Sequence, residues 1–343
     1  MSVDQLDTAT LGPYLDAHIE GFNGLQSTEK FAGGQSNPTF LLRADSGQYV
    51  LRRKPPGELL KSAHAVDREF RVITALGDSD VPVAHGYHLC EDDDVIGSMF
   101  YVMSFVDGRI FWDPTLPDSS NDERTAIYDE MNRVLATLHG VDIAAVGLND
   151  YGKPGNYFER QVGRWTKQYL AAETETIEPM DELMKWLPKH MPADDGQVAL
   201  VHGDYRLDNM IFHPTESRIL AIVDWELSTL GHPYADLAYQ CMQWRLPNVG
   251  ISRGLADIDR DALGIPSESE YVAGYCRRTE RDGISNWTFC LAFSFFRLAS
   301  IVQGVLKRSL DGNASNTSAN QLGKMTRPLA QHAIDLIDAN SEC

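Results

Sequence analysis

A short part of the chain, residues 200–226, carries the polar side chains that phosphoryl transfer requires. Asp204 stands five residues before Asn209, with Arg206 between them, and Asp224 ends the next apolar run, twenty residues after Asp204. In phosphoryl transfer one carboxylate accepts the proton of the attacking hydroxyl, oxygen ligands hold magnesium, and a cation faces the γ-phosphate. This stretch supplies all of these groups.

The spacing of these residues matches a known catalytic loop. Protein kinases have the sequence H-R-D-L-x-x-x-N followed by a later magnesium-binding aspartate, and His202-Gly-Asp204 precedes Asn209 here at the same Asp-to-Asn interval. H-G-D alone is a weak signal, but together with Val223-Asp-Trp-Glu226 it is specific. Only twelve residues separate Asp224 from Asp236 and no A-P-E sequence follows, which favours a small substrate over a protein.

The residues that precede this loop predict a small lobe rich in β-structure. Strands are expected at 39–42, 49–52, 84–89 and 99–105, and helices at 4–22 and 62–76. The first two strands are joined by a polar, glycine-containing turn and should form a hairpin. Ser62 is the expected N-cap of the second helix. Asp107-Gly108 indicates a hinge.

The rest of the chain is mainly helical in character. Helices are expected at 122–139, 156–171 and 178–190 and again from residue 267 onward, with short strands at 198–201 and 219–223. We therefore predict an α+β fold of two lobes. Residues 1–107 would form a nucleotide-binding lobe, and residues 108–343 a larger, mostly helical lobe for catalysis and substrate binding.

Two features of the first lobe suit a nucleotide. Gly33-Gly34-Gln35-Ser36-Asn37 precedes the hairpin, and backbone N–H groups approach phosphates closely where no side chain intervenes. In the second hairpin strand, alternation places Val50 and Arg52 on one face, which is the arrangement of the small apolar residue and the lysine of V-A-I-K. Arg52 would thus replace the lysine, with Lys54 as second choice and Glu69 as the partner acid.

Several motifs resemble those of the aminoglycoside phosphotransferase and choline kinase family, whose members have a protein-kinase-like fold. The motifs are GGQSNPTF, YVLRRKPPG, AHAVDREFRV, VHGDYRLDN, VDWELSTLGHPYADLAY and FRLASIVQG. The likeness covers essentially the whole chain. It is similar above all to the branch that includes the kinase-like domain fused to some animal acyl-CoA dehydrogenases.

The resemblance implies a role for each motif residue. Asp204 would be the base, Asn209 and Asp224 would hold Mg²⁺, His202 would support the loop, and Glu226 would assist near the metal. Asp236 would cap the following segment and anchor the loop. Residues 33–37 would cover the phosphates of ATP or GTP. The adenine would pack near Val50 and bond the backbone of Met103, Ser104 and Phe105.

Charge and cysteine content limit the partners. With 49 acidic against 30 basic residues the net charge is -19, so we expect neither nucleic acid nor a membrane as a partner. The exception is a basic group of residues, Arg53, Lys54, Lys61, Arg68 and Arg71. The five cysteines form no C-x-x-C pair, which argues against zinc. The N-terminus has no secretory signal, so we expect a cytoplasmic location.

The acceptor is less well indicated than the chemistry. Candidate lining residues are Tyr157, Arg164, Trp165, Trp244 and Arg297, all of which could equally be core or surface residues. Resemblance to the acyl-CoA dehydrogenase branch suggests a hydroxyacyl-CoA thioester, and the basic group could hold its phosphates. The alternatives are an aminoglycoside or other antibiotic, a nucleotide-binding pseudokinase, and a metal-dependent hydrolase that uses His202, Asp204 and Asp224.

Overall fold

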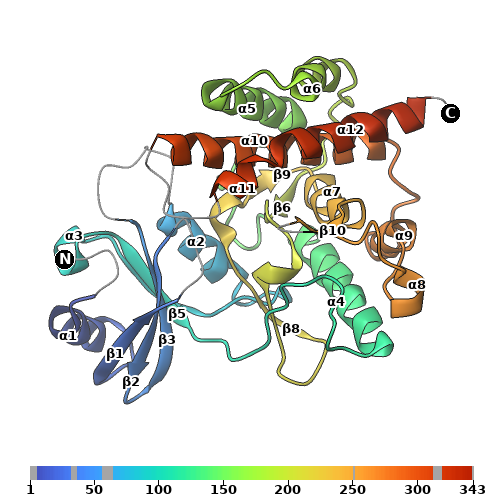
Figure 1. The fold of residues 1–343 in the computed structure, drawn as a ribbon. Coiled ribbons are helices and arrows are strands. Elements are labelled where there is room, and N and C mark those ends of the chain that lie inside the picture. Colours follow the sequence, from blue (N-terminus) through green and yellow to red (C-terminus); the bar gives the residue numbers. More distant parts are fainter. Residues whose placement is uncertain (1–5, 32–36, 56–64, 250–251, 312–318, 342–343) are drawn as a thin grey trace. The chain divides into compact units, whose positions relative to one another are not determined.

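The computed structural model describes residues 6–31, 37–55, 65–249, 252–311 and 319–341 (Figure 1). The chain divides into two compact units. The sheet unit comprises residues 1–110, 144–148 and 209–228, and the helical unit comprises residues 111–143, 149–208 and 229–343. Asn209 and Asp224 thus belong to the sheet unit, whereas Asp204 belongs to the helical unit. The lobe boundary at residue 107 stays a prediction.

An antiparallel sheet in the order β1-β2-β3-β5-β4 forms the centre of the sheet unit. Its strands are β1 Leu25–Lys30, β2 Thr39–Ala44, β3 Gly47–Arg53, β4 Gly86–Cys90 and β5 Phe100–Ser104. The predicted hairpin is present as β2 and β3, which pair from Thr39–Arg52 to Ala44–Gly47. Strand β1, with the sequence LQSTEK, is a largely exposed edge strand and has no apolar alternation that would predict it.

Helices and a second hairpin complete the sheet unit. They are α1 Thr8–His18, α2 Val66–Leu76, α3 Asp93–Ile96, and the hairpin of β7 Met210–Phe212 with β8 Ile219–Ile222. The apolar residues that predicted the first helix, Leu6, Leu11, Leu15 and Ile19, are all buried in the same core as Phe40 and Leu51. The predicted N-cap Ser62 lies outside the described residues, and α2 begins at Val66.

The helical unit contains the longer helices and short strands. Its helices are α4 Asn121–His139, α5 Tyr157–Ala172, α6 Glu178–Lys189, α7 Tyr234–Cys241, α8 Arg260–Leu263, α9 Glu268–Arg278, α10 Trp287–Leu310, α11 Ala319–Gly323 and α12 Thr326–Ser341. Strand β6 Ala199–Val201 pairs with β9 Thr229–Gly231, and β10 Asn248–Val249 pairs with β11 Ser252–Arg253. The helices predicted at 122–139, 156–171 and 178–190 are present as α4, α5 and α6. The fold class is α+β, as predicted.

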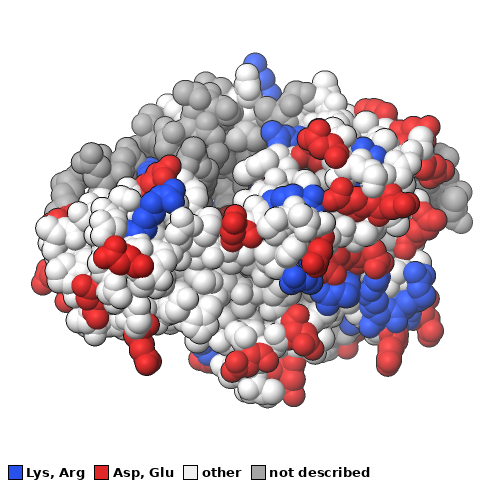
Figure 2. All heavy atoms as spheres, turned by 90° about the horizontal axis from the view of Figure 1, so that it is seen from below, with Lys and Arg blue, Asp and Glu red and all other residues white. Residues whose placement is uncertain are grey.

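Helix α10 is the central helix of its unit, packed by α5, α7 and α12. Its length and its mean hydropathy of 1.8 would suffice to cross a membrane, but 72% of its most apolar window is buried inside the protein. The core helix of a water-soluble domain has the same character, so this helix is weak evidence for a membrane span. Figure 2 shows one face of the molecule, on which acidic and basic side chains are interspersed.

Candidate active site

Arg52 on β3 is the centre of a charged cluster in the sheet unit. Its Nε lies 2.8 Å from a carboxylate oxygen of Glu69 on α2, and its Nη2 lies 2.6 Å from Oδ1 of Asp224. Glu226 is 3.9 Å from the same Nη2. The ion pair that strand alternation and helix position predicted between Arg52 and Glu69 is therefore present, although its role toward a nucleotide stays a prediction.

Glu69 is almost fully buried and is held by two neutral donors besides Arg52. The Asn37 side-chain amide donates to it over 2.7 Å and the Tyr101 hydroxyl over 3.2 Å. Burial raises the pKa of Glu69 above its ordinary value, and the positive charge of Arg52 opposes this shift. Asn37 thus has a buried structural role that the sequence did not indicate, while Gly33, Gly34, Gln35 and Ser36 lie outside the described residues.

Asp224 and Asn209 come from the two ends of the β7–β8 hairpin region. The Val223 amide donates to the Asn209 carbonyl over 2.9 Å, which holds these two segments together. Asp224 has a φ of +66°, in the left-handed region that few non-glycine residues occupy. Such backbone geometry is common at functional sites.

A carboxylate and an amide oxygen suit Mg²⁺, which prefers oxygen ligands and keeps several waters or phosphate oxygens. Asp224 and Asn209 supply this donor set from neighbouring segments, and Asp224 is partly exposed. Within the described ranges no three His, Cys, Asp or Glu side chains gather into a richer metal cluster. The residues present therefore fit a magnesium ion that is shared with phosphates.

In the helical unit, Asp236 fixes the backbone of the loop that carries Asp204. Its carboxylate accepts hydrogen bonds from the amides of His202, over 2.6 Å, and of Gly203, over 2.8 Å, and it lies 3.4 Å from Nε2 of His139. The loop-anchoring contacts implied for Asp236 are therefore present. His202 is buried, and its Nδ1 accepts the Asp204 amide over 3.2 Å.

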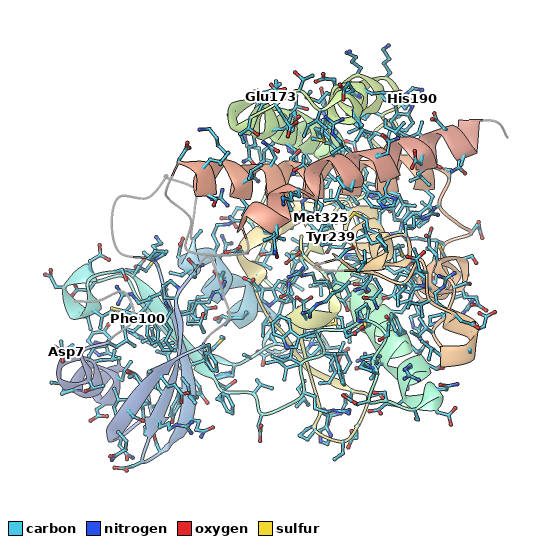
Figure 3. All side chains as sticks on the ribbon, in the orientation of Figure 1. Asp7, Phe100, Glu173, His190, Tyr239 and Met325 are labelled. Carbon is cyan, nitrogen blue, oxygen red and sulfur yellow. The ribbon has the colours of Figure 1, made fainter. Side chains whose placement is uncertain are left out.

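The carboxylate of Asp204 is surrounded by donors and cations. The hydroxyl of Tyr239 on α7, labelled in Figure 3, donates to it, and Nε of Arg206 lies 3.4 Å away. Burial acts to raise the pKa of Asp204, but Arg206, Tyr239 and His202 together bring this pKa below its ordinary value. Asp204 is therefore ionised at neutral pH, as a general base must be.

One neighbour of Asp204, Tyr239, was missing from the sequence-based description, and a second, Arg297, was expected in another role. Tyr239 lies three residues after Asp236, one helical turn away, so the periodicity of α7 would have indicated it. Arg297, expected as an acceptor residue, is instead buried on α10, where it donates to the Gly203 carbonyl and lies 5.0 Å from the Tyr239 ring centre. Arg297 thus stabilises the loop that carries Asp204 through the Gly203 carbonyl.

Arg206 is tied to acidic side chains of its own loop. Besides Asp204 it contacts Asp208, 2.9 Å away, and its side chain is about half exposed. Arg206 thus lies beside Asp204 with part of its side chain exposed, and its role toward a phosphate stays a prediction.

The expected adenine contacts map onto neighbouring strands of the sheet unit. Val50 pairs with Met103 across β3 and β5. The Ser104 amide already donates to the His85 carbonyl over 2.8 Å. A nucleotide base would therefore bond other backbone groups of the 103–105 segment.

The other acceptor candidates and the basic group have mixed positions. Tyr157 and Trp165 are buried on α5, Trp244 is buried with its Nε1 donating to Pro266, and Arg164 is exposed. In the basic group, Lys61 lies outside the described residues. Arg53 is buried, Lys54 faces Asp67 at 3.9 Å, and Arg68 and Arg71 donate to the carbonyls of Ser228 and Gly147. These contacts weaken the argument that this group binds ligand phosphates.

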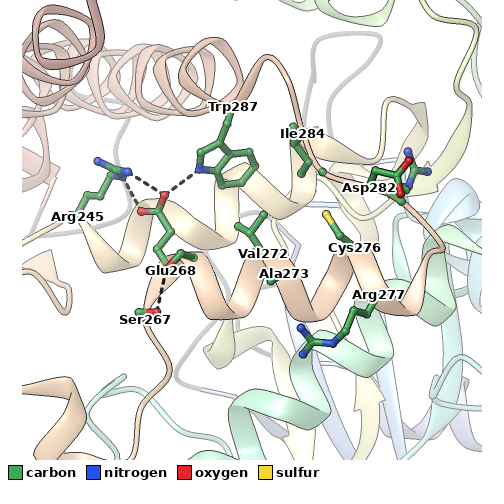
Figure 4. Close-up of a pocket in the computed structure, with 13 residues that line it drawn as sticks. Arg245, Ser267, Glu268, Val272, Ala273, Cys276, Arg277, Asp282, Ile284 and Trp287 are labelled. Atoms are coloured by element: carbon green, nitrogen blue, oxygen red, sulfur yellow. Dashed lines mark hydrogen bonds and ion pairs between the residues drawn. The ribbon is translucent and has the colours of Figure 1, made fainter. Parts of the chain in front are cut away.

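A cavity of about 720 Å³ lies beside α9 (Figure 4). Its wall includes Glu268, which accepts hydrogen bonds from Arg245 and from Trp287, each over 2.8 Å. Burial raises the pKa of the lining thiol Cys276, which makes it a poor nucleophile. Glu268 is thus fully engaged, and neither group is suited to catalysis.

Comparison with known proteins agrees with this geometry. Residues 27–278 match the model of the phosphotransferase enzyme family, and the chain belongs to that family. A crystal structure of a candidate aminoglycoside phosphotransferase from Ralstonia eutropha is 53% identical, covers 98% of this chain and 99% of its own, and has a TM-score of 0.89. The fold is therefore the protein-kinase-like fold that the resemblance implied.

Two other proteins are similar to the chain to different extents. Mouse acyl-CoA dehydrogenase family member 10 is 49% identical over 327 residues, which are 94% of this chain but 30% of that protein. The predicted relation to the acyl-CoA dehydrogenase branch is thus confirmed, and the chain spans less than a third of this relative. Spectinomycin phosphotransferase, solved with ADP and spectinomycin, shares the fold with a TM-score of 0.63 over 96% of this chain and 98% of its own, at 13% identity.

Proposed function

We propose that the protein is a magnesium-dependent kinase that transfers the γ-phosphoryl group of ATP to a hydroxyl of a small molecule. The observation that carries this proposal is the environment of Asp204. This ionised carboxylate lies in a loop whose backbone is fixed by Asp236. The Tyr239 hydroxyl orients the carboxylate itself. The ADP bound to spectinomycin phosphotransferase supports an adenine nucleotide as the donor.

Each residue then has one task. Asp204 orients the acceptor hydroxyl and takes its proton as the oxygen attacks phosphorus. Asn209 and Asp224 would hold Mg²⁺, which neutralises phosphate charge when it is bound. Arg52 is kept in place by its ion pairs with Glu69 and Asp224 and would supply positive charge to the nucleotide phosphates.

The competing hypotheses account for fewer observations. In a hydrolase His202 would bind a metal or act as a base, yet it is buried and its Nδ1 accepts the Asp204 amide. In a pseudokinase the base or the metal ligands would be replaced, whereas Asp204, Asn209 and Asp224 are all present.

We further propose a hydroxyl on an acyl-CoA thioester as the acceptor, with an aminoglycoside as the alternative. The support is the relationship to the kinase-like part of acyl-CoA dehydrogenase family member 10, whose name indicates acyl-CoA chemistry. The matched region is 30% of that relative, and under this proposal the chain phosphorylates a thioester of the class that the relative's name indicates.

Incubation with Mg-ATP and separate 3-, 4- and 5-hydroxyacyl-CoA thioesters, followed by mass spectrometry, tests both proposals. We expect a phosphate adduct on at least one thioester with wild-type protein and none with Asp204→Asn. Turnover of an aminoglycoside without any thioester adduct would retain the kinase and overturn the acceptor. No ATP-dependent adduct on any alcohol would overturn the kinase proposal.

A further inference from the structure

A groove on the helical unit is lined by cations in an otherwise acidic protein. It has a volume of about 830 Å³ and lies along the first half of α5 and the loop before it. Four basic side chains line it, Lys153, Arg160, Arg164 and Lys167, against one acid, Glu159. With a net charge of -19 the protein as a whole repels anions. An anionic ligand would therefore need such a local concentration of positive charge.

These four cations have no acidic partners. In the described part of the chain none of them forms an ion pair with a carboxylate, although acidic residues outnumber basic ones 49 to 30. Arginines elsewhere, such as Arg206 and Arg278, contact aspartates. Arg160, Arg164 and Lys167 stand four and three residues apart and so share one helix face. Like charges at this spacing destabilise a helix slightly.

Arg160 shapes the groove. Its guanidinium donates to the carbonyls of Lys153, over 2.5 Å, and Pro154, over 3.4 Å, which joins the preceding loop to α5. Arg160 therefore fixes the backbone, while Lys153, Arg164 and Lys167 are exposed to solvent and are available to a ligand.

The groove is connected to the loop that carries Asp204. The guanidinium carbons of Arg164 and Arg297 lie 5.3 Å and 5.6 Å from the centre of the Trp165 ring. Arg297 in turn donates to the carbonyl of Gly203, the residue before Asp204. Arg164 in the groove is therefore linked to the loop that carries Asp204 through Trp165 and Arg297.

The ring of Trp165 has an unused donor. Its Nε1 is buried and makes no hydrogen bond among the described residues. A buried indole N–H normally has an acceptor. Trp165 does not line the groove, so this donor is a buried unsatisfied atom of α5 and adds nothing to the case for a ligand.

We propose that this groove binds the phosphate groups of the acceptor, with Arg164 and Lys167 as the phosphate-contacting residues. The inference rests on the proposed kinase function and specifies its substrate class: a phosphate-bearing, polyanionic molecule such as a CoA thioester. A CoA carries its phosphates at the opposite end from its thioester, so the hydroxyl can reach Asp204 while the phosphates lie along α5. The same charges would repel the cationic aminoglycosides.

Calorimetric titration of coenzyme A into the full chain without nucleotide tests this inference. We expect Arg164→Gln/Lys167→Gln to weaken binding roughly tenfold or more, because charge-assisted hydrogen bonds to phosphate are lost. The matched control, Lys185→Gln/Lys189→Gln on α6, removes the same charge from exposed positions and should bind as the wild type does. Circular dichroism of both variants checks that α5 and the fold are retained.

Two further measurements test whether binding depends on the phosphates and whether it occurs in this groove. Binding of coenzyme A should weaken with added salt more in the wild type than in Arg164→Gln/Lys167→Gln, and pantetheine, which has no phosphate, should bind both proteins alike. Three results would each overturn the inference. They are wild-type affinity for coenzyme A in Arg164→Gln/Lys167→Gln, loss of this affinity only in Arg52→Ala, and no binding of coenzyme A by the wild type. Because no phosphoryl transfer is measured, failure here is distinct from failure of the kinase proposal.

Discussion

The guanidinium of Arg52 lies 2.6 Å from the carboxylate of Asp224 through its Nη2 and 2.8 Å from the carboxylate of Glu69 through its Nε. One cation on β3 is therefore shared by an acid of α2 and an acid that follows β8. Since the side chain of Glu69 is only 1% exposed, its charge depends on Arg52 for compensation. The pair thus has a structural role in addition to the one we propose toward phosphate.

Replacing Arg52 should affect both stability and nucleotide binding. Arg52→Ala leaves Glu69 buried without its counter-ion, a change that typically costs about 3–5 kcal/mol of unfolding free energy. Arg52→Ala/Glu69→Gln should recover a large part of this loss, because the uncompensated charge is gone. Urea denaturation measures the unfolding free energy of both variants.

Replacing Arg52 should also change the kinetics. Arg52→Lys should retain some activity, whereas Arg52→Ala should raise the KM for ATP sharply. If Arg52→Ala is mild and Lys54→Ala is damaging, Lys54 is the phosphate residue.

The metal ligands are best tested by variants that keep the backbone. Asp224→Asn removes one charge but tolerates the left-handed φ of +66° better than alanine would. We expect Asp224→Asn and Asn209→Ala each to raise the magnesium concentration for half-maximal rate by roughly tenfold. Rate measured against magnesium at saturating ATP reports this. An unchanged magnesium dependence in both variants would contradict the assigned metal site.

Asp236 should make the protein sensitive to acid. Burial acts to raise the pKa of Asp236, but the hydrogen bond and charge of His139, together with the Gly203 amide, bring it below its ordinary value of 3.8. A carboxyl with a lowered folded-state pKa stabilises the fold above its unfolded pKa and loses that contribution as pH falls. Asp236→Asn should therefore be less stable at pH 7, and the difference from wild type should shrink below about pH 3.8. A constant difference across this range would argue against the assignment.

Tyr239 should act on the rate through Asp204. Its hydroxyl donates to the Asp204 carboxylate and helps to lower that pKa. Tyr239→Phe removes this bond, so the pKa of Asp204 should rise, and the acid limb of the pH profile for kcat should move to higher pH. A purely structural role would lower kcat without moving that limb. Tyr234→Phe on the same helix is the control, because the Tyr234 hydroxyl accepts a hydrogen bond from Arg281 over 3.1 Å and its loss should leave the limb in place.

The fold could be predicted where local patterns were strong. The apolar faces of α4 and α1, and the hairpin of β2 and β3, follow from periodicity and a glycine-containing turn. The strands β7 and β9, which were not predicted, have three residues each, too few to show a period. Assignment of residues 209–228 to the sheet unit depends on long-range contacts that local sequence does not encode.

The candidate site shows the same division between local and distant contacts. The Arg52–Glu69 pair followed from strand alternation and a helix face, and the anchoring of the loop by Asp236 followed from the family motif. Arg297 approaches the Gly203 carbonyl across 94 residues, so its supporting role required the packing of α10. Asn37 was expected at a phosphate and instead donates to Glu69, a contact that only the fold reveals.

The most direct test of the account is the single-turnover rate of Asp204→Asn, measured with saturating Mg-ATP and an acceptor that wild type phosphorylates. Asparagine keeps the size of the side chain but cannot take the proton, so we expect the rate to fall by about 10²–10⁴ while ATP affinity changes little. Circular dichroism and ATP titration of the variant show that the fold and the nucleotide site remain. A variant that keeps more than about a tenth of the wild-type rate, well above the range for loss of a general base, would contradict the assignment of Asp204 as the catalytic base.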